Sequence, residues 1–296
     1  MPIDPITGAY RLASVVARSI PSPWVPGASD LAGTAARQAL RGRRSMIARH
    51  LQRSRPGLTG SELDAAVDAA FDSYARYWVE SFRLPTMSPE ELDAAFSFEG
   101  FDHIVRAREA GLGSIVALPH LGGWEWAAFW LASIEHIPIT AIVETLEPPA
   151  LFEWFVDFRR SLGMNVVGLG PTAGSESLRA LRRAEVLCLL CDRDIGGGGI
   201  EVEFFGERTT LPGGPATLAF RSGAPLLPSA IYFEGAGHRA VIGPPLDVER
   251  QGSLRTDIAR VTQDLAHALE SLIDAAPEQW HLMQPNWPSD LEAFPG

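Results

Sequence analysis

The sequence has no lysine, so arginine supplies all 25 of its basic residues. It also lacks an uninterrupted apolar run of the roughly 18 residues that a transmembrane helix needs. Glu125, Glu135 and His136 divide its most apolar region. Near the amino terminus, Asp4 and Arg11 interrupt the apolar residues that a signal peptide would require. We therefore expect neither a membrane-spanning helix nor a cleaved signal peptide.

Cysteine is scarce as well, with Cys188 and Cys191 as the only two. Redox and zinc motifs normally place their first cysteine in a loop or at a helix start. These two lie inside the apolar run of residues 186–191, with no second cysteine pair or matching histidine set in the sequence. We expect two buried thiols, no disulfide and no metal site.

Negative charge dominates the composition, with a formal net charge of −11 and a pI of about 5.1. This balance argues against general nucleic-acid binding. The basic residues are unevenly placed, because residues 31–61 contain no acidic residue but include Arg37, Arg41, Arg43, Arg44, Arg49, Arg53 and Arg55. One interpretation is a solvated helix face. The other is attraction to anionic lipid headgroups, worth about 1 kcal/mol per residue. We favour the second, with Arg41, Arg43 and Arg44 as membrane-binding residues, because the amphipathic segment 5–20 lies close by.

Strand-length apolar segments alternate with helical patterns from residue 101 onward. This alternation indicates an α/β fold with a central, mostly parallel sheet flanked by helices. The first 100 residues are predicted to be a helical cap, with helices over 5–20 and 31–53, on an α/β body formed by residues 101–296. We expect a single domain over the whole chain. The predicted strands cover residues 114–118, 139–144, 164–169, 186–191 and 226–233, with a partner at 239–243, and an extended segment at 201–205 precedes a loop through 211–215.

His120 is the candidate catalytic residue. It follows the predicted strand 114–118 after Pro119, which cannot donate to a sheet ladder. Two glycines and a helical pattern come next, so His120 lies at a strand-to-helix junction. In open α/β sheets such junctions face the crevice where ligands bind. The alternative is a loop histidine that only makes hydrogen bonds to the backbone.

Carboxylates are available to His120 from two places. Glu125 lies five positions further on, within the first turn of the following helix. Asp192 follows the predicted strand 186–191 and so reaches the same edge of a parallel sheet. Either carboxylate would fix the imidazole tautomer and stabilise its protonated form. The sequence has no Gly-x-Ser-x-Gly elbow, so a serine hydrolase triad is weakly supported.

Together these motifs make the chain similar to a known family. The box His120-Leu-Gly-Gly-Trp-Glu125 resembles the His-x4-Asp/Glu box of glycolipid and glycerolipid acyltransferases. Two segments, Ser73-Tyr-Ala-Arg-Tyr-Trp78 and Phe82-Arg-Leu-Pro85, resemble the actinobacterial phosphatidylinositol mannoside acyltransferases within it. The similarity covers nearly the whole chain, because further motifs follow in the family's order: Asp192-Arg193-Asp194, Phe204-Phe-Gly-Glu207, Pro212-Gly-Gly-Pro-Ala216, Gly223-Ala-Pro-x-x-Pro228 and Pro277-Glu-Gln-Trp280-x-x-x-Gln284-x-x-Trp287.

The resemblance implies transfer of a long acyl chain from acyl-CoA to a sugar hydroxyl of a membrane glycolipid, foremost a phosphatidylinositol mannoside. It implies no covalent acyl-enzyme, with His120 as general base, Asp192 as its supporting carboxylate and Glu125 as the acidic member of the box. It implies no bound cofactor or metal. The expected partners are acyl-CoA, an anionic glycolipid and a membrane surface, and the expected location is peripheral, on the cytoplasmic face of the cell membrane. The residues expected to bind substrate are Arg159, Glu144, Arg193, Gly122, Gly123 and Trp124.

The chain also departs from the mannoside acyltransferase pattern. Glu125 stands where the box usually has Asp, and Asp192 where the later triplet usually begins with Glu. Gly123 stands where Asn is frequent. Because the two carboxylates are exchanged in length, a related glycolipid or lysolipid stays open as the acceptor. A thioesterase or lipid hydrolase on the same scaffold and a non-enzymatic lipid-binding protein are the other hypotheses.

Overall fold

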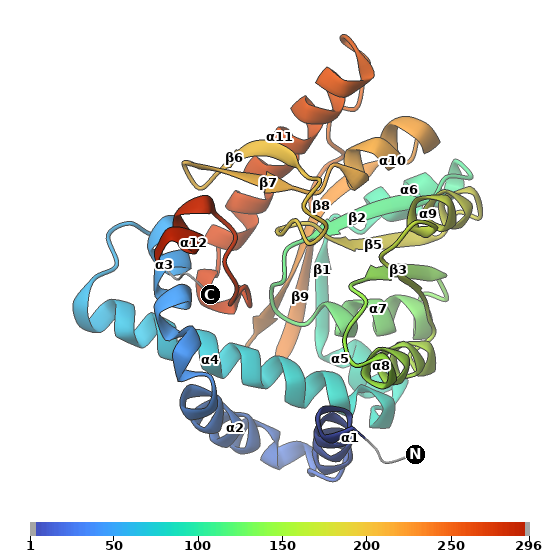
Figure 1. Cartoon of the computed structure of the whole chain (residues 1–296). Helices are drawn as coiled ribbons and strands as arrows, with labels where there is room; N and C mark the ends of the chain where they lie inside the picture. Colours follow the sequence, from blue (N-terminus) through green and yellow to red (C-terminus); the bar gives the residue numbers. More distant parts are fainter. Residues whose placement is uncertain (1–3, 294–296) are drawn as a thin grey trace.

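A seven-stranded sheet in the order β1-β9-β8-β2-β5-β3-β4 forms the centre of the computed structural model, which describes residues 4–293 (Figure 1). Neighbouring strands run parallel, except that β8 and β9 form an antiparallel hairpin. The predicted α/β class with a mostly parallel sheet is therefore confirmed. The strands are β1 (Phe96–Glu99), β2 (Ser114–Leu118), β3 (Ile139–Val143), β4 (Met164–Gly168), β5 (Val186–Leu190), β6 (Ile200–Phe204), β7 (Glu207–Leu211), β8 (Leu226–Glu234) and β9 (Gly237–Ile242).

Helices cover both faces of this sheet. Residues of α4, α5, α7 and α8 join the core on one face, and residues of α9, α10 and α11 join the core on the other. The arrangement is a three-layer sandwich. The helices are α1 (Pro5–Arg18), α2 (Val25–Ala39), α3 (Arg44–Ser54), α4 (Gly60–Arg83), α5 (Pro89–Ala94), α6 (Asp102–Glu109), α7 (Trp124–Ser133), α8 (Pro149–Ser161), α9 (Ala173–Arg182), α10 (Gly214–Ser222), α11 (Leu254–Asp274) and α12 (Pro288–Ala293).

The central strand β2 shows why this sheet must be covered on both sides. All of its residues are buried. Val116 and Leu118 pack into the core under α7 and α8, whereas Ile115 and Ala117 pack into the core under α10 and α11. Successive side chains of a strand point to opposite faces. An uninterrupted apolar run is therefore the pattern of a strand with helices on both sides.

The amino-terminal part differs from the prediction in two ways. The single helix expected over 31–53 is two helices, because a 3-10 turn at Arg41–Arg43 separates α2 from α3. Gly42 lies in this turn, and glycine is a poor helix former. The region before residue 101 is also not purely helical, since β1 pairs in parallel with β9 at the sheet edge.

The expected loop through 211–215 begins later than predicted. β6 and β7 form an antiparallel hairpin joined by Phe205 and Gly206. Both turn residues have positive φ, 51° and 72°, as a tight type I′ turn requires. Phenylalanine is unusual at such a position, which explains why the turn was not recognised from the sequence. Only residues 212 and 213 remain between β7 and α10.

Candidate active site

His120 and Asp192 form the centre of the candidate active site. β2 and β5 are neighbours in parallel register, with Leu118 opposite Leu190. His120 and Asp192 each lie two residues beyond that pair, so both emerge at the same carboxyl edge of the sheet. Nδ1 of His120 is 2.6 Å from Oδ1 of Asp192, and the backbone N–H of His120 donates to Oδ2 at 3.0 Å.

The surroundings of Asp192 determine the tautomer of His120. Asp192 is fully buried, and its Oδ2 also accepts a hydrogen bond from the Trp280 indole at 2.7 Å. Burial alone would raise the pKa of the Asp192 carboxyl, but the charge of His120 and the hydrogen bonds from His120 and Trp280 hold this pKa below its usual value. An ionised carboxylate only accepts hydrogen bonds, so the imidazole proton lies on Nδ1. In the neutral imidazole Nε2 of His120 then carries the lone pair, and it makes no hydrogen bond within residues 4–293.

Glu125 belongs to a second cluster and does not pair with His120. Its Oε1 accepts hydrogen bonds from the Tyr77 hydroxyl at 2.9 Å and from Nη2 of Arg159 at 3.0 Å. Burial raises the pKa of the Glu125 carboxyl, while Arg159 and Tyr77 act in the opposite direction. Its Oε2 is buried without a hydrogen-bond partner in the described part of the chain. Of the two carboxylates considered from the sequence, Asp192 is thus the one that contacts the imidazole.

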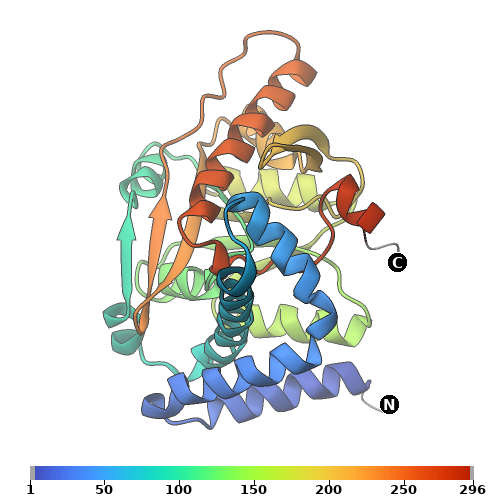
Figure 2. The same ribbon diagram turned by 90° about the vertical axis from the view of Figure 1, so that its left-hand side faces the viewer.

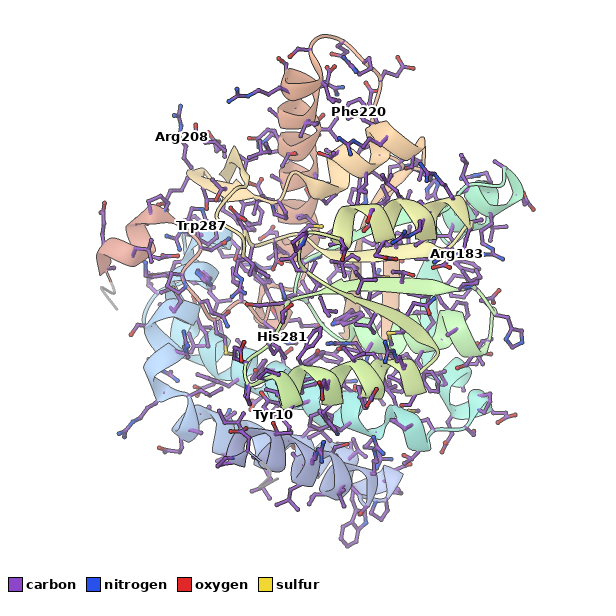
Figure 3. All side chains as sticks on the ribbon, turned by 45° about the vertical axis from the view of Figure 1, so that its right-hand side comes forward. Tyr10, Arg183, Arg208, Phe220, His281 and Trp287 are labelled. Carbon is purple, nitrogen blue, oxygen red and sulfur yellow. The ribbon has the colours of Figure 1, made fainter. Side chains whose placement is uncertain are left out.

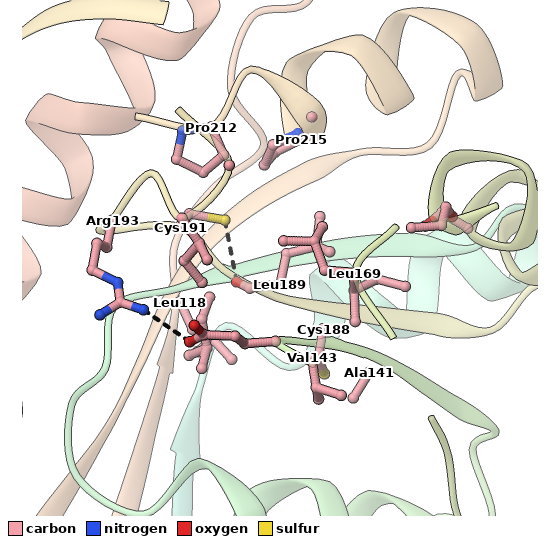
Figure 4. Close-up of a pocket in the computed structure, with 18 of the residues that line it drawn as sticks. Leu118, Ala141, Val143, Leu169, Cys188, Leu189, Cys191, Arg193, Pro212 and Pro215 are labelled. Carbon is pink, nitrogen blue, oxygen red and sulfur yellow. Dashed lines mark hydrogen bonds and ion pairs between the residues drawn. The ribbon is translucent and has the colours of Figure 1, made fainter. Parts of the chain in front are cut away.

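A cavity of about 610 Å³ opens beside the His120 side chain. Its walls along β2, β3 and β5 and at the carboxyl end of β4 are apolar, and Figure 4 shows Leu118, Ala141, Val143, Leu169 and Leu189 along them. His120, Tyr77 and Arg159 also line it. A cavity of this size and lining is typical of a site for a small molecule with a long apolar part. Cys188 and Cys191 contribute buried thiols to the same walls, as expected.

Glu144 and Arg193 line the cavity from neighbouring loops. Glu144 follows β3, and Arg193 follows Asp192 after β5. Nη2 of Arg193 donates to Oε2 of Glu144 at 2.8 Å, the ion pair drawn as a dashed line in Figure 4. The structure thus places both predicted substrate-binding residues on the cavity wall, paired with each other.

The three predicted substrate-binding residues after His120 separate into two groups. Trp124 lines the cavity, and its ring lies 5.1 Å from the Arg159 guanidinium carbon. Gly122 and Gly123 instead face β8 and β9. A Cβ atom at Gly122, which has φ of +56°, would lie only 1.8 Å from the Ile231 carbonyl oxygen. Neither glycine lines the cavity, and close packing accounts for both, so their part in substrate binding stays a prediction.

At Gly123 the obstacle is a histidine side chain. A Cβ atom there would lie 2.6 Å from Nε2 of His238, whose ring stacks on Trp126 with a centroid distance of 4.1 Å. The imidazole of His238 thus occupies the space that a side chain at position 123 would need. This explains why glycine stands where the related pattern frequently has asparagine.

Most arginines of the arginine-rich segment form ion pairs with carboxylates of the same chain. Arg44 was expected to be available for lipid headgroups. Instead, its guanidinium pairs with Asp64 and Asp68. Arg41 and Arg43 form no ion pair within residues 4–293, although Nη1 of Arg43 donates to the Met283 carbonyl. The other arginines of the segment also pair with carboxylates: Arg37 with Asp72, Arg49 with Asp290, Arg53 with Glu207 and Asp290, and Arg55 with Asp274.

An apolar surface lies at the same end of the molecule. Both views place α1 and α2 together at the bottom (Figures 1 and 2). Large apolar side chains on α1, on α2 and on the 3-10 turn between them are each more than half exposed: Ile6, Leu12, Val15, Val16, Trp24 and Leu31. In the part of the chain that the structure describes, no helix combines the length and apolarity that a bilayer crossing requires.

Two residues next to the His120–Asp192 pair were not predicted from the sequence to belong to the site. Trp280 donates to Asp192, and His281 packs against Tyr77, with 5.4 Å between ring centroids. Figure 3 labels His281 near the middle of the molecule. Its Nε2 is 2.9 Å from the Ser73 hydroxyl, and burial lowers its pKa to about 3, so it is uncharged. The sequence signal for Trp280 and its neighbour His281 is the tail motif Pro277-Glu-Gln-Trp280, which resembles the family pattern but predicted no function for either residue.

Comparison with known proteins places the chain among acyltransferases. Residues 3–289 match the family described as bacterial lipid A biosynthesis acyltransferase. The phosphatidylinositol mannoside acyltransferase of Mycobacterium tuberculosis (strain CDC 1551 / Oshkosh) is 38% identical over 292 residues, which is 96% of this chain and 89% of that protein. Its namesake in Mycolicibacterium smegmatis is 36% identical over 95% of this chain and 91% of its own length. The lipid A biosynthesis acyltransferase of Haemophilus influenzae is 24% identical over 78% of this chain and 71% of its own length.

Proposed function

Because the chain belongs to the bacterial lipid A biosynthesis acyltransferase family, and is thus an acyltransferase, we propose that it transfers a long fatty acyl chain from acyl-CoA to a sugar hydroxyl of a membrane glycolipid. The acceptor we propose is a phosphatidylinositol mannoside, since relatives that cover nearly the whole chain are named for that activity. The proposed site is the His120–Asp192 pair at the edge of the apolar cavity.

One observation carries this proposal: His120 lines a large apolar cavity while Asp192 holds the Nδ1 side of its ring, which leaves Nε2 without a hydrogen bond within residues 4–293. An acyl chain needs an apolar space, and an attacking hydroxyl needs a base beside the acyl carbonyl. Both requirements meet at His120. Arg159, Glu144 and Arg193 supply the charged groups around the cavity that suit a polar or anionic acceptor headgroup.

The proposed step needs only the side chains of this site. The acceptor oxygen bonds to the thioester carbonyl carbon while its proton passes to Nε2 of His120. Asp192 stabilises the imidazolium that forms. The carbon–sulfur bond then breaks, and the CoA sulfur leaves as a thiol by taking up that proton. General base catalysis of this kind contributes roughly 10²–10⁴-fold.

The cysteines beside the cavity do not supply an alternative nucleophile. Burial raises the pKa of Cys188 to about 12 and raises that of Cys191 still further. Thiols with such pKa values stay protonated near neutral pH, and only the thiolate is a good nucleophile. This supports direct transfer without a covalent acyl-enzyme.

We also propose that the enzyme lies on the cytoplasmic face of the membrane through α1 and α2. Their exposed apolar side chains suit shallow insertion, and Arg41 and Arg43 suit contact with anionic headgroups. Stable attachment generally needs two such signals. Arg44 is left out of this proposal because Asp64 and Asp68 hold it against α4.

The test is incubation with radiolabelled acyl-CoA and a phosphatidylinositol mannoside, followed by separation of the lipids. We expect label in an acylated mannoside and no label that remains on the denatured protein. Free fatty acid as the main product would instead favour a thioesterase or lipid hydrolase. Label in neither lipid product would contradict the proposed substrates.

A further inference from the structure

The segment 279–286, called here the C-terminal strap, fastens the two loops that carry His120 and Asp192. On the side of His120, the Gln279 carbonyl accepts from the Gly122 N–H at 3.1 Å, and the His281 N–H donates to the His120 carbonyl at 2.7 Å. Leu121 and Trp280 form a short antiparallel bridge between them. The strap therefore runs directly along the catalytic loop.

The strap also holds Asp192 at two points. The Trp280 indole donates to Oδ2 of the side chain at 2.7 Å, and Nδ2 of Asn286 donates to the Asp192 carbonyl oxygen at 2.9 Å. Trp280 and Asp192 are both buried, so the indole contact is shielded from water. A hydrogen bond to a buried charge is considerably stronger than one at the surface.

A buried carboxylate, Asp290, anchors the far end of the strap. Its Oδ2 accepts from the backbone N–H groups of Asn286 and Trp287, at 3.0 and 3.2 Å. Arg49 and Arg53 of α3 pair with its Oδ1 at 3.1 and 2.7 Å. Two arginines of the segment predicted to attract lipid headgroups, Arg49 and Arg53, thus hold the strap in place.

We propose that Trp280 is a positioning residue for the acyl transfer: its indole N–H holds the Asp192 carboxylate in the orientation in which Oδ1 meets Nδ1 of His120. Trp280 does not line the cavity, so it acts through Asp192 and not on a substrate. The inference rests on the proposed function, because it concerns the base of that reaction.

The charges around Asp192 allow this role to be measured by pH dependence. The titratable groups that act on it are His120 from the β2–α7 loop, its chain neighbour Cys191, and His281 from the strap. Burial keeps the Cys191 thiol protonated and the His281 imidazole neutral. Neither the Cys191 thiol nor the His281 imidazole therefore adds a charge beside Asp192.

The test compares Trp280→Phe with Trp287→Phe across a pH series. Trp287 is a matched control, because it is equally buried and its indole donates to the Phe204 carbonyl instead of to Asp192. Without the indole N–H, the Asp192 carboxylate holds the imidazole proton more strongly. We expect Trp280→Phe to lower kcat roughly tenfold or more with little change in KM, and to move the acid limb of the rate profile to higher pH. Trp287→Phe lowers the melting temperature but leaves the profile in place.

A second variant separates the hydrogen bond from packing. Trp280→3-benzothienylalanine keeps the shape of the side chain but has sulfur in place of the N–H, so it should shift the profile as Trp280→Phe does. An unchanged acid limb in this variant, with His120→Ala inactive, overturns the inference and leaves the proposed function standing. If His120→Ala itself retains transfer, the proposed function and the inference fail together.

Discussion

His120 and Asp192 lie two residues beyond Leu118 and Leu190, which are paired in adjacent parallel strands, and their side chains meet at 2.6 Å. The register of β2 and β5 alone therefore brings the proposed base and its carboxylate together. Asp192 also accepts two further N–H groups on Oδ2, from the His120 backbone and from Trp280. Hydrogen bonds thus hold both oxygens of the Asp192 carboxylate in place.

This geometry predicts a severe effect of Asp192→Asn. If the amide NH₂ takes the place of Oδ2, it faces two N–H donors. If it takes the place of Oδ1, it donates to Nδ1 and moves the imidazole proton to Nε2, where it blocks the base. By analogy with the aspartate of the serine protease triad, we expect kcat to fall roughly 10³–10⁴-fold. Initial rates of acyl transfer with a melting curve provide the measurement, and a loss of less than tenfold would contradict the fixed tautomer.

Arg159→Ala should destabilise the protein more at pH 8 than at pH 5. Arg159 counteracts the rise in the Glu125 pKa that burial causes, so its removal raises this pKa further. Because the folded pKa lies above the unfolded value, the stability falls as pH rises from the unfolded pKa through the folded one. Removing one partner of a buried pair costs about 3–5 kcal/mol when the other stays charged.

Denaturant unfolding at the two pH values measures this difference. The control is Arg159→Ala in a Glu125→Gln background, where position 125 cannot titrate and the pH-dependent part of the loss should vanish. An equal loss at both pH values in the single variant would show that Glu125 stays ionised without Arg159.

Gly123→Ala and His238→Ala should be strongly coupled. The alanine Cβ would lie 2.6 Å from Nε2 of His238 and 2.8 Å from its Cδ2. Overpacking of this kind costs about 1–3 kcal/mol. In a His238→Ala background the space is open, so Gly123→Ala should cost much less. A double-mutant cycle of unfolding free energies checks this, and additive losses would refute the explanation for glycine at this position.

Arginine and apolar side chains should both contribute to membrane attachment, but only the arginine contribution should depend on salt. Arg41→Ala with Arg43→Ala should weaken binding to anionic vesicles at low salt, about fivefold for each arginine. The effect should fade as salt rises, because charges are screened within about 8 Å at physiological ionic strength. Leu12→Ser with Val15→Ser should weaken binding at every salt concentration, since both side chains are largely exposed apolar groups on α1.

Arg44→Ala is the matched control for this series. Asp64 and Asp68 hold its guanidinium against α4, so its loss should matter less than the loss of Arg41. Vesicle flotation across a salt series gives the comparison. Equal weakening by Arg44→Ala and Arg41→Ala would mean that only net charge matters.

The sequence was most informative where apolar runs are buried on both faces. The predicted strands 114–118, 139–144, 164–169 and 186–191 agree with β2, β3, β4 and β5 to within one residue at either end. β2 is buried throughout, whereas only Met164 is buried in the edge strand β4, so coverage on both faces explains the agreement for β2 and not for β4. The four-residue strand β1 and the polar strand β7 were missed, since neither has a run of buried side chains. Their pairing depends on β9 and β6, which local pattern does not reveal.

For the site, sequence order gave the candidates but not the pairing. Both Glu125 and Asp192 were plausible partners of His120, and only the strand register decides between them. Contacts of residues far apart in sequence were also out of reach. One example is the ion pair between Arg44 and Asp64. Another is the hydrogen bond from Trp280 to Asp192, two residues that lie 88 positions apart in the sequence.

The most direct test of the proposed mechanism is the transfer rate of His120→Ala. The side chain is 34% exposed and makes its one side-chain hydrogen bond, among residues 4–293, to Asp192. The variant should therefore keep the fold while it loses the only histidine that lines the cavity in that range. We expect acylation of the mannoside acceptor to fall by roughly 10²–10⁴-fold with an unchanged melting curve. A rate within a few-fold of the wild type, in protein that melts at the same temperature, would contradict His120 as the general base.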